Sequence, residues 1–191
     1  MANKNWPMGF QAVQRLGGGI PVIRTYAMNA TAAIYKGEPL DVALGGTTGQ
    51  VQKFASKTNF NTAVAAGKLA GVAAEYYPGS ALGSTKTRIA VWDPVQNVFE
   101  AQMNTGATAG MTAGDYLFKN AQATTLTGGS TITGLSSGKI NFTSLGSTAT
   151  YPIRIIDISK DVANCDVNAS YCNVLCQFVQ GFPASQNTSP A

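Results

Sequence analysis

The chain contains no histidine, few charged residues and only three cysteines. The absence of histidine removes the commonest general base and the commonest metal ligand, and it excludes both Ser-His-Asp and Cys-His catalysis. Charged residues make up 12% of the chain, against about 25% in average proteins. The surface must therefore be neutral and rich in hydroxyl groups. Such a surface gives a monomer little charge-based solubility, which favours a protein partly covered by other subunits.

The cysteine and glycine motifs form no recognisable cofactor site. Cys165, Cys172 and Cys176 have the spacing C-x6-C-x3-C, which lacks the paired C-x2-C spacing of zinc sites. We expect three buried, reduced thiols, and the count leaves one disulfide open. Gly17–Gly19 and Gly45–Gly49 lack the signatures of phosphate and dinucleotide loops, so we interpret them as turns. The sequence predicts no metal, no cofactor and no catalytic residue.

Two further classes of partner are disfavoured by the distribution of charge and apolar residues. The net charge of +4 comes from 13 basic and 9 acidic residues that are spread thinly, whereas nucleic-acid binders cluster Lys and Arg on one face. No apolar run approaches the length of a membrane span, and the N-terminus MANKNWPMGF lacks the pattern of a secretory signal. We therefore expect no nucleic acid, no membrane, and synthesis inside a cell.

The clearest structural signal is the stretch Arg88–Met103, RIAVWDPVQNVFEAQM. Two runs that alternate at period two flank Asp93-Pro94, and Asp followed by Pro is typical of a type I turn. The pattern predicts a β-hairpin with Ile89 and Val91 on one face of its first strand. A hairpin alone is marginally stable in water, so further strands must pack against it.

Short alternating runs separated by Gly-rich turns predict those strands, and together they indicate an all-β protein with a small barrel or sandwich. We divide the chain into an extended N-terminal arm (1–30), a β-barrel domain (31–160) and a C-terminal extension (161–191). The domain contains a Thr/Ser/Gly-rich excursion (122–149). Tyr116–Lys119 is a predicted short strand. Further strands are expected at Leu40–Leu44, Gln50–Phe54, Leu69–Tyr77 and Tyr151–Ile158, with a bulge or close backbone approach at Gly71.

The arm has two interpretations of equal weight. Pro and Gly interrupt it too often for a long helix, yet it has more apolar residues than a disordered tail. It either packs back on its own domain or reaches across to a neighbouring subunit. If it contacts a partner, the first candidates are Trp6, Met8, Phe10 and Arg15, with Arg24 as a weaker one, because interfaces are enriched in aromatic residues, Met and Arg. On this hypothesis, deletion of residues 2–20 would abolish partner binding and leave the barrel folded.

The order of these features resembles a known family. The segments AIYKGEPLDVALGGTTGQVQKF, LAGVAAEYY, RIAVWDPVQNVFEAQM and AGDYLFKNA, within residues 30–120, are similar to the small β-barrel cement or decoration proteins that coat the heads of tailed bacteriophages. The resemblance implies a structural protein of the virion, made in the host cytoplasm. It implies that the protein binds the major capsid protein, often as a homotrimer, and clamps neighbouring capsomers. No part of this pattern covers the excursion or the cysteine-bearing tail.

Two alternatives of other classes stay open. The first is a fibre or adhesin module that binds glycans through the excursion, for which Phe142 would be the aromatic contact. The second is a hydrolase that uses a pair of carboxylates. Several of the nine acidic residues in this chain lie at expected turns, where Asp is favoured for local hydrogen bonding. We therefore expect that the protein is not an enzyme.

Overall fold

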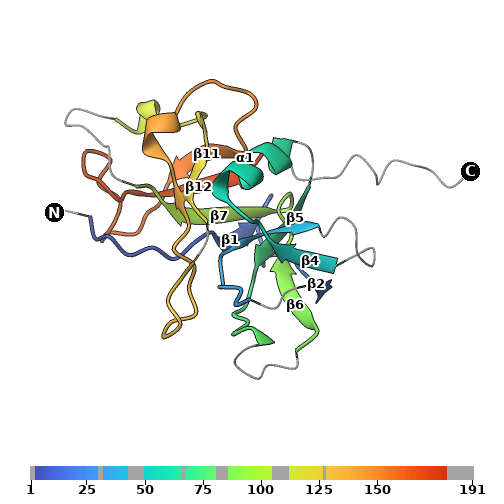
Figure 1. Cartoon of the computed structure of the whole chain (residues 1–191). Coiled ribbons are helices and arrows are strands. Elements are labelled where there is room, and N and C mark those ends of the chain that lie inside the picture. The colour runs from blue at the N-terminus through green and yellow to red at the C-terminus, as the bar shows by residue number, and fades with distance from the viewer. Residues whose placement is uncertain are drawn as a thin grey trace, which may run out of the picture.

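Two β structures organise the chain, a closed five-stranded barrel and a separate five-stranded sheet, which Figure 1 shows in different parts of the molecule. This computed structural model describes residues 3–29, 32–42, 50–65, 68–80, 86–104, 112–126 and 128–179, apart from the side chains of Ala63, Ala65 and Thr125. Most of its regular structure is strand, which confirms the predicted all-β class and the predicted barrel.

The barrel closes through a strand from the N-terminal segment. β2 (Ile23–Met28) runs parallel to β4 (Gln50–Lys53) and antiparallel to β6 (Arg88–Trp92). β3 (Pro39–Val42) and β5 (Leu69–Ala73) complete the ring through antiparallel pairs. β2 lies within residues 1–30, which were predicted to be an arm outside the barrel domain, yet it supplies the strand that closes the barrel.

A small apolar cluster lies within the barrel. Ile89 and Val91, which share one face of β6 as their alternation predicts, are fully buried in it beside Leu40. β5 has an irregular register next to Gly71, whose φ is +152°. A Cβ atom on Gly71 would lie 2.4 Å from Cγ1 of Val91 and 2.5 Å from the carbonyl oxygen of Trp92. This confirms the predicted close backbone approach.

The second β structure is an antiparallel sheet built from both ends of the chain. Its central strand is β12 (Asn173–Phe178), flanked by β7 (Asn97–Gln102) and β11 (Ile153–Ile158). β1 (Gln11–Arg15) and the two-residue β8 (Asn120–Ala121) form the edges. Ile153 and Ile155 face the core, as the alternation in this stretch predicts.

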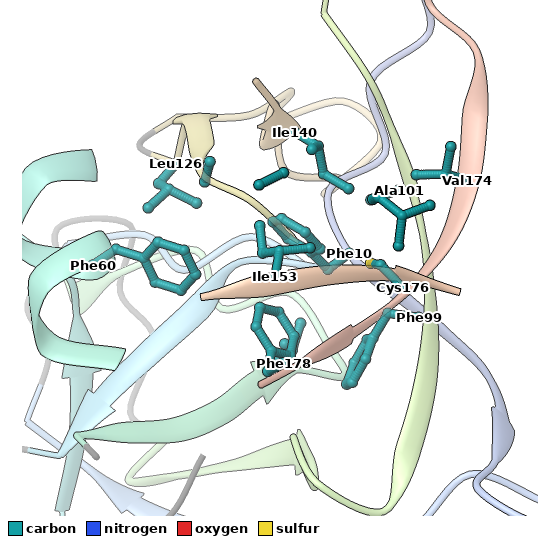
Figure 2. Close-up of a cluster of buried hydrophobic side chains, with 14 of the residues drawn as sticks. Phe10, Phe60, Phe99, Ala101, Leu126, Ile140, Ile153, Val174, Cys176 and Phe178 are labelled. Atoms are coloured by element: carbon teal, nitrogen blue, oxygen red, sulfur yellow. The ribbon is translucent and has the colours of Figure 1, made fainter. Parts of the chain in front are cut away.

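The main core lies against this sheet, and aromatic rings form its centre (Figure 2). The centroid of the Phe178 ring is 5.3 Å from that of Phe10, 5.1 Å from that of Phe99 and 6.1 Å from that of Phe60. Phe60 comes from α1 (Lys57–Ala65), a helix of nine residues. The cluster also includes Ala101, Leu126, Ile140, Ile153, Val174 and Cys176.

The hairpin predicted over Arg88–Met103 is wrong, although both of its strands form. β6 pairs with β2 and β5, whereas β7 pairs with β1 and β12, so its arms belong to different β structures. The Asp93-Pro94 turn is present, and the Asp93 carboxylate accepts hydrogen bonds at 3.0 Å from the backbone N–H groups of Val95 and Gln96. Side-chain bonds thus hold a turn that carries the chain from the barrel into the sheet.

The described parts of the two terminal segments, residues 3–29 and 161–179, are integral to the fold. We expected an arm over 1–30 and an extension over 161–191, but β1 is a sheet edge, β2 closes the barrel and β12 is the central sheet strand. Their apolar side chains complete the main core. The strand predicted over Tyr116–Lys119 is also wrong: a turn follows η2 (Ala113–Asp115), and the strand begins at Asn120.

The excursion contains two short strands and a 3-10 helix. Its β9 (Ala123–Thr125) pairs with β10 (Lys139–Ile140), and the 3-10 helix η3 (Phe142–Ser144) follows. Between these strands the chain makes a narrow turn through residues 129–136, at whose tip Ile132 is 95% exposed.

Candidate functional site

The five residues predicted to contact a partner differ in exposure. Phe10 is fully buried in the chain's own core, so as a surface contact it is a wrong prediction; an aromatic residue in the arm fits a core as well as an interface. Trp6 is 65% exposed, and Met8 is half-buried. Arg15 and Arg24 are exposed at the two ends of the β1–β2 connection.

The segment before β1 packs on its own chain. The buried side-chain amide of Gln102 accepts a hydrogen bond from the backbone N–H of Trp6 at 3.1 Å and donates one to the carbonyl of Lys4 at 2.9 Å. Oδ1 of Asn164 accepts a further bond from the backbone N–H of Lys4 at 2.6 Å. Of the two interpretations of the arm, packing on its own domain therefore describes residues 3–28. The indole of Trp6 nevertheless stays at the surface.

The connection between β1 and β2, which we call the N-terminal loop (Leu16–Val22), is a glycine turn with apolar flanks. Gly17–Gly19 have φ values of +87°, +94° and +97°, in the left-handed region that favours glycine. Backbone bonds between Arg15 and the second and third of these glycines close the turn. Leu16 is exposed on one side of it and Ile20, 87% exposed, on the other. The prediction of a turn here is confirmed.

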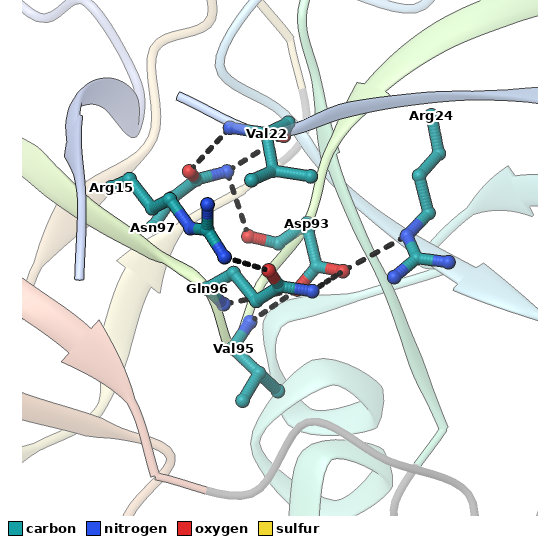
Figure 3. A network of polar contacts seen from close by, with 7 residues as sticks. All are labelled: Arg15, Val22, Arg24, Asp93, Val95, Gln96 and Asn97. Carbon is teal, nitrogen blue, oxygen red and sulfur yellow. Dashed lines mark hydrogen bonds and ion pairs between the residues drawn. The ribbon is translucent and has the colours of Figure 1, made fainter. Parts of the chain in front are cut away.

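Buried polar groups hold the base of this loop (Figure 3). The amide nitrogen of Asn97 donates to the carbonyl of Val22 at 2.8 Å, and its oxygen accepts from the backbone N–H of Val22 at 2.7 Å. The same nitrogen donates to the carbonyl of Asp93 at 3.0 Å. The backbone N–H of Leu16 donates to the carbonyl of Gln96 at 2.6 Å. Both ends of the N-terminal loop are thereby attached to the segment between β6 and β7.

Four side chains form a row of polar contacts beside the loop, which we call the arginine row: Arg15, Gln96, Asp93 and Arg24 (Figure 3). Nη2 of Arg15 lies 3.5 Å from Oε1 of Gln96, and Nε2 of Gln96 lies 3.4 Å from Oδ2 of Asp93. Nε of Arg24 forms an ion pair with the same Asp93 oxygen at 3.0 Å. Asp93 is buried, whereas both arginines reach solvent.

Exposed bulky apolar side chains are concentrated in this part of the chain. Among the described residues, five of the nine such side chains lie between positions 6 and 23: Trp6, Val13, Leu16, Ile20 and Ile23. Single exposed apolar residues are normal, so it is their concentration in one segment that makes this segment the candidate contact region. The sequence carried a signal for it, a triple glycine with apolar residues on both sides, but composition alone did not separate these side chains from core residues.

A second charged group lies inside the barrel wall. Glu38 is almost fully buried, accepts a bond from the backbone N–H of Tyr35 at 2.9 Å and lies 3.4 Å from Nζ of Lys53. Burial raises the pKa of its carboxyl to about 7, although the Tyr35 N–H and Lys53 act in the opposite direction. Among the described residues, one cation and one backbone N–H contact this carboxylate, so we interpret it as a structural ion pair next to β3.

Among the described residues, the cysteines and the excursion form no further candidate site. Cys172 and Cys176 are buried and Cys165 is exposed, so the prediction of three buried thiols is wrong for Cys165; all three are free. Phe142, on which the glycan alternative depended, is half-buried with its ring centroid 6.0 Å from that of Tyr116. In the described ranges, no group of three His, Cys, Asp or Glu residues could hold a metal ion.

No helix in the part of the chain that the structure describes is long and apolar enough to cross a membrane. A scan against protein-family models, a search of curated proteins and a search of solved structures each find no match to this chain. Evidence for a function therefore comes from the residues and contacts of the N-terminal loop and its surroundings.

Proposed function

We propose that this chain is a cement or decoration protein of a tailed-bacteriophage head, which binds the outside of the shell and clamps neighbouring capsomers by non-covalent contacts. One observation carries the proposal: the exposed bulky apolar side chains are concentrated on a firmly attached N-terminal loop and the segments next to it. The resemblance of residues 30–120 to that family supports the same conclusion.

The attachment of the loop favours binding. A contact loop that is mobile before binding loses conformational entropy when it docks, and this loss weakens the complex. Here Asn97 and Gln96 fix both ends of the loop through hydrogen bonds of 2.6 to 2.8 Å. The exposed side chains of Leu16 and Ile20 then lie on a loop whose two ends are fixed. A protein that clamps a shell needs this kind of rigid apolar contact and needs no reaction chemistry.

The partners in this proposal are the major capsid protein and further copies of the same chain. We infer a homotrimer on the shell, because a threefold assembly would match local threefold symmetry in a capsid. Light scattering over a dilution series measures the state in solution, and the ratio of bound chains to capsid subunits measures the state on the head. The expected bound stoichiometry is a multiple of three at each site.

The direct test is co-sedimentation of the purified chain with empty heads of the phage that encodes it. Ile20→Ser is compared with Ile132→Ser, since both isoleucines lie in surface turns and are 87% and 95% exposed. We expect Ile20→Ser to weaken binding about tenfold and Ile132→Ser to change it less than about twofold. Failure of the unaltered chain to bind heads would contradict the proposal. Equal binding by both variants would contradict the role of the N-terminal loop.

Deletion of residues 2–20 does not serve as this test. It would remove Phe10, which is fully buried, together with the edge strand β1. Loss of binding by such a deletion would report unfolding as readily as loss of contact. The expectation that the barrel stays folded without these residues is therefore replaced by single substitutions at exposed positions.

A further inference from the structure

We propose that the N-terminal loop docks on an apolar protein surface whose rim carries carboxylates, and that Arg15 and Arg24 are its two charged contacts. This inference rests on the proposed function and names the chemistry of the capsid surface. The geometry of the arginine row, with its two guanidinium groups at opposite ends, supports it.

The arginine row leaves positive charge at the surface. It contains two guanidinium groups and one carboxylate, and that carboxylate, on Asp93, is 4% exposed. Arg24 bonds Asp93 through Nε, and within the described residues neither of its terminal amino groups has a protein partner. The side chain of Arg15 makes one contact with other described residues, and this contact is long, 3.5 Å to Gln96. A partner therefore meets arginine N–H donors and not the buried carboxylate.

Each arginine is directly followed or preceded by an exposed apolar residue. Leu16 follows Arg15, and Ile23 precedes Arg24, while Ile20 lies between them at the loop. Arg is enriched in protein interfaces, and the fully buried centre of an interface is more apolar than the rest of the protein surface. Nucleic-acid surfaces instead use many clustered cations and stacked aromatic rings. The composition of this surface therefore favours a protein partner.

Carboxylates are the matching groups on that partner. A guanidinium offers a planar fork of donors that a carboxylate accepts through two parallel bonds. The ion pair with Asp93 holds Arg24 in place before binding, so less side-chain entropy of this residue is lost on docking. Such charge pairs at the edge of an interface steer association and weaken as salt is added.

The test compares Arg15→Glu with Lys160→Glu in the co-sedimentation assay, at salt concentrations from about 50 mM to about 500 mM NaCl. Both side chains are exposed and both substitutions change the net charge equally. Arg15→Glu leaves the Arg24–Asp93 ion pair intact, so the fold is expected to persist. Arg24→Gln is the second variant, with its melting temperature measured because it removes the cation that faces Asp93.

We expect Arg15→Glu to weaken binding to heads by about tenfold or more at low salt and Lys160→Glu to change it less than about twofold. Added salt should weaken the unaltered chain more than Arg15→Glu. If the unaltered chain binds heads but Arg15→Glu binds equally well at every salt concentration, the inference is overturned while the proposed function stands. If the unaltered chain binds no heads, the proposed function is contradicted, and the inference that rests on it is contradicted too. Arginine-dependent binding to a DNA oligonucleotide or to heparin, without binding to heads, would contradict the inference that the partner is a protein.

Discussion

The side chain of Asn97 pairs with the backbone of Val22 as a neighbouring strand would. One amide donates to the Val22 carbonyl at 2.8 Å and accepts from its N–H at 2.7 Å, and it is fully buried. Asn97 begins β7 in the sheet, and Val22 directly precedes β2 in the barrel. This pair therefore joins the two β structures at the point where the N-terminal loop is attached.

Asn97→Ala should destabilise the whole protein. The substitution removes three hydrogen bonds and leaves the N–H and carbonyl of Val22 without this partner in a part-buried site. We expect the free energy of unfolding in urea to fall by on the order of 2–3 kcal/mol. Asn59→Ala, at an exposed position on α1, is the control and should change it by less than about 0.5 kcal/mol. Equal changes in the free energy of unfolding for the two variants would show that the bonds between Asn97 and Val22 do not stabilise the fold.

Gly71→Ala and Gly18→Ala separate steric conflict from backbone strain. Both glycines have positive φ, but a Cβ on Gly71 would lie 2.4 Å from Val91, whereas none of the surrounding atoms lies within 4 Å of a Cβ on Gly18. Gly18→Ala should cost about 1 kcal/mol from its backbone conformation alone. Gly71→Ala should cost about 3 kcal/mol or more, because β5 and β6 must move apart. Thermal unfolding of the two variants measures the difference.

The buried carboxyl of Glu38 predicts that stability depends on pH. Burial raises its pKa from 4.5 to about 7 in the folded chain, so between these values the folded state binds a proton that the unfolded state lacks. The free energy of unfolding should therefore decrease as pH rises from about 4.5 to about 7, by about 3 kcal/mol from this group. Urea unfolding across this range measures it.

Glu38→Gln isolates that contribution from those of other acids. Burial also raises the pKa of Asp41, whereas hydrogen bonds from Thr112 lower that of Asp115, so the profile of the unaltered chain combines several groups. The amide in Glu38→Gln does not titrate, and the stability of this variant relative to the unaltered chain should rise by about 3 kcal/mol from pH 4.5 to pH 8. A constant difference across this range would contradict the raised pKa.

Alternation along single strands was enough to predict β6 and β11 and the faces that they bury. The pleat places alternate side chains on opposite faces, so Ile89 and Val91, or Ile153 and Ile155, must be buried together. The pairing of strands did not follow in the same way. The neighbours of β7 lie at residues 11–15 and 173–178, far along the chain, and local patterns carry little information about such contacts.

In the candidate site too, the local features were predictable from the sequence and the long-range contacts were not. The turn at Gly17–Gly19 and the exposure of Arg15 and Arg24 agree with the sequence pattern, because they depend on local conformation and charge. The attachment of the loop depends on Val22 and Asn97, which lie 75 residues apart. Phe10 was placed at the surface because an aromatic side chain suits a core and an interface equally, and only the packed structure distinguishes them.

One of the three thiols should react quickly with a disulfide reagent, and the other two should react slowly. Cys165 is exposed, whereas burial raises the pKa of the Cys172 thiol to about 12 and that of the Cys176 thiol even further above its usual range. Because the thiolate is the reactive form, a disulfide reagent should label one thiol per chain rapidly in the folded protein and all three after unfolding. Cys165→Ser should remove the fast phase, and a rapid reaction that persists in this variant would contradict the burial of the other two.

Phe10→Ala and Trp6→Ala should separate folding from binding within the N-terminal segment. Phe10 is fully buried with its ring centroid 5.3 Å from that of Phe178, so its truncation should cost about 3–5 kcal/mol of unfolding free energy. Trp6 is 65% exposed, and the bond from its backbone N–H to Gln102 is kept in Trp6→Ala, so stability should change by less than about 0.5 kcal/mol.

Among the folded molecules of each variant, the effects on binding to empty heads should be reversed: Trp6→Ala should weaken binding more than Phe10→Ala does. Trp6→Ala removes an exposed aromatic side chain of the kind that dominates interfaces and should weaken binding about tenfold, while folded Phe10→Ala should bind as the unaltered chain does. Circular dichroism on the sedimented samples establishes the folded fraction. If Trp6→Ala binds normally, the contact with the shell is confined to the N-terminal loop, because Trp6 is bonded to Gln102 before β1 begins, whereas the loop follows β1.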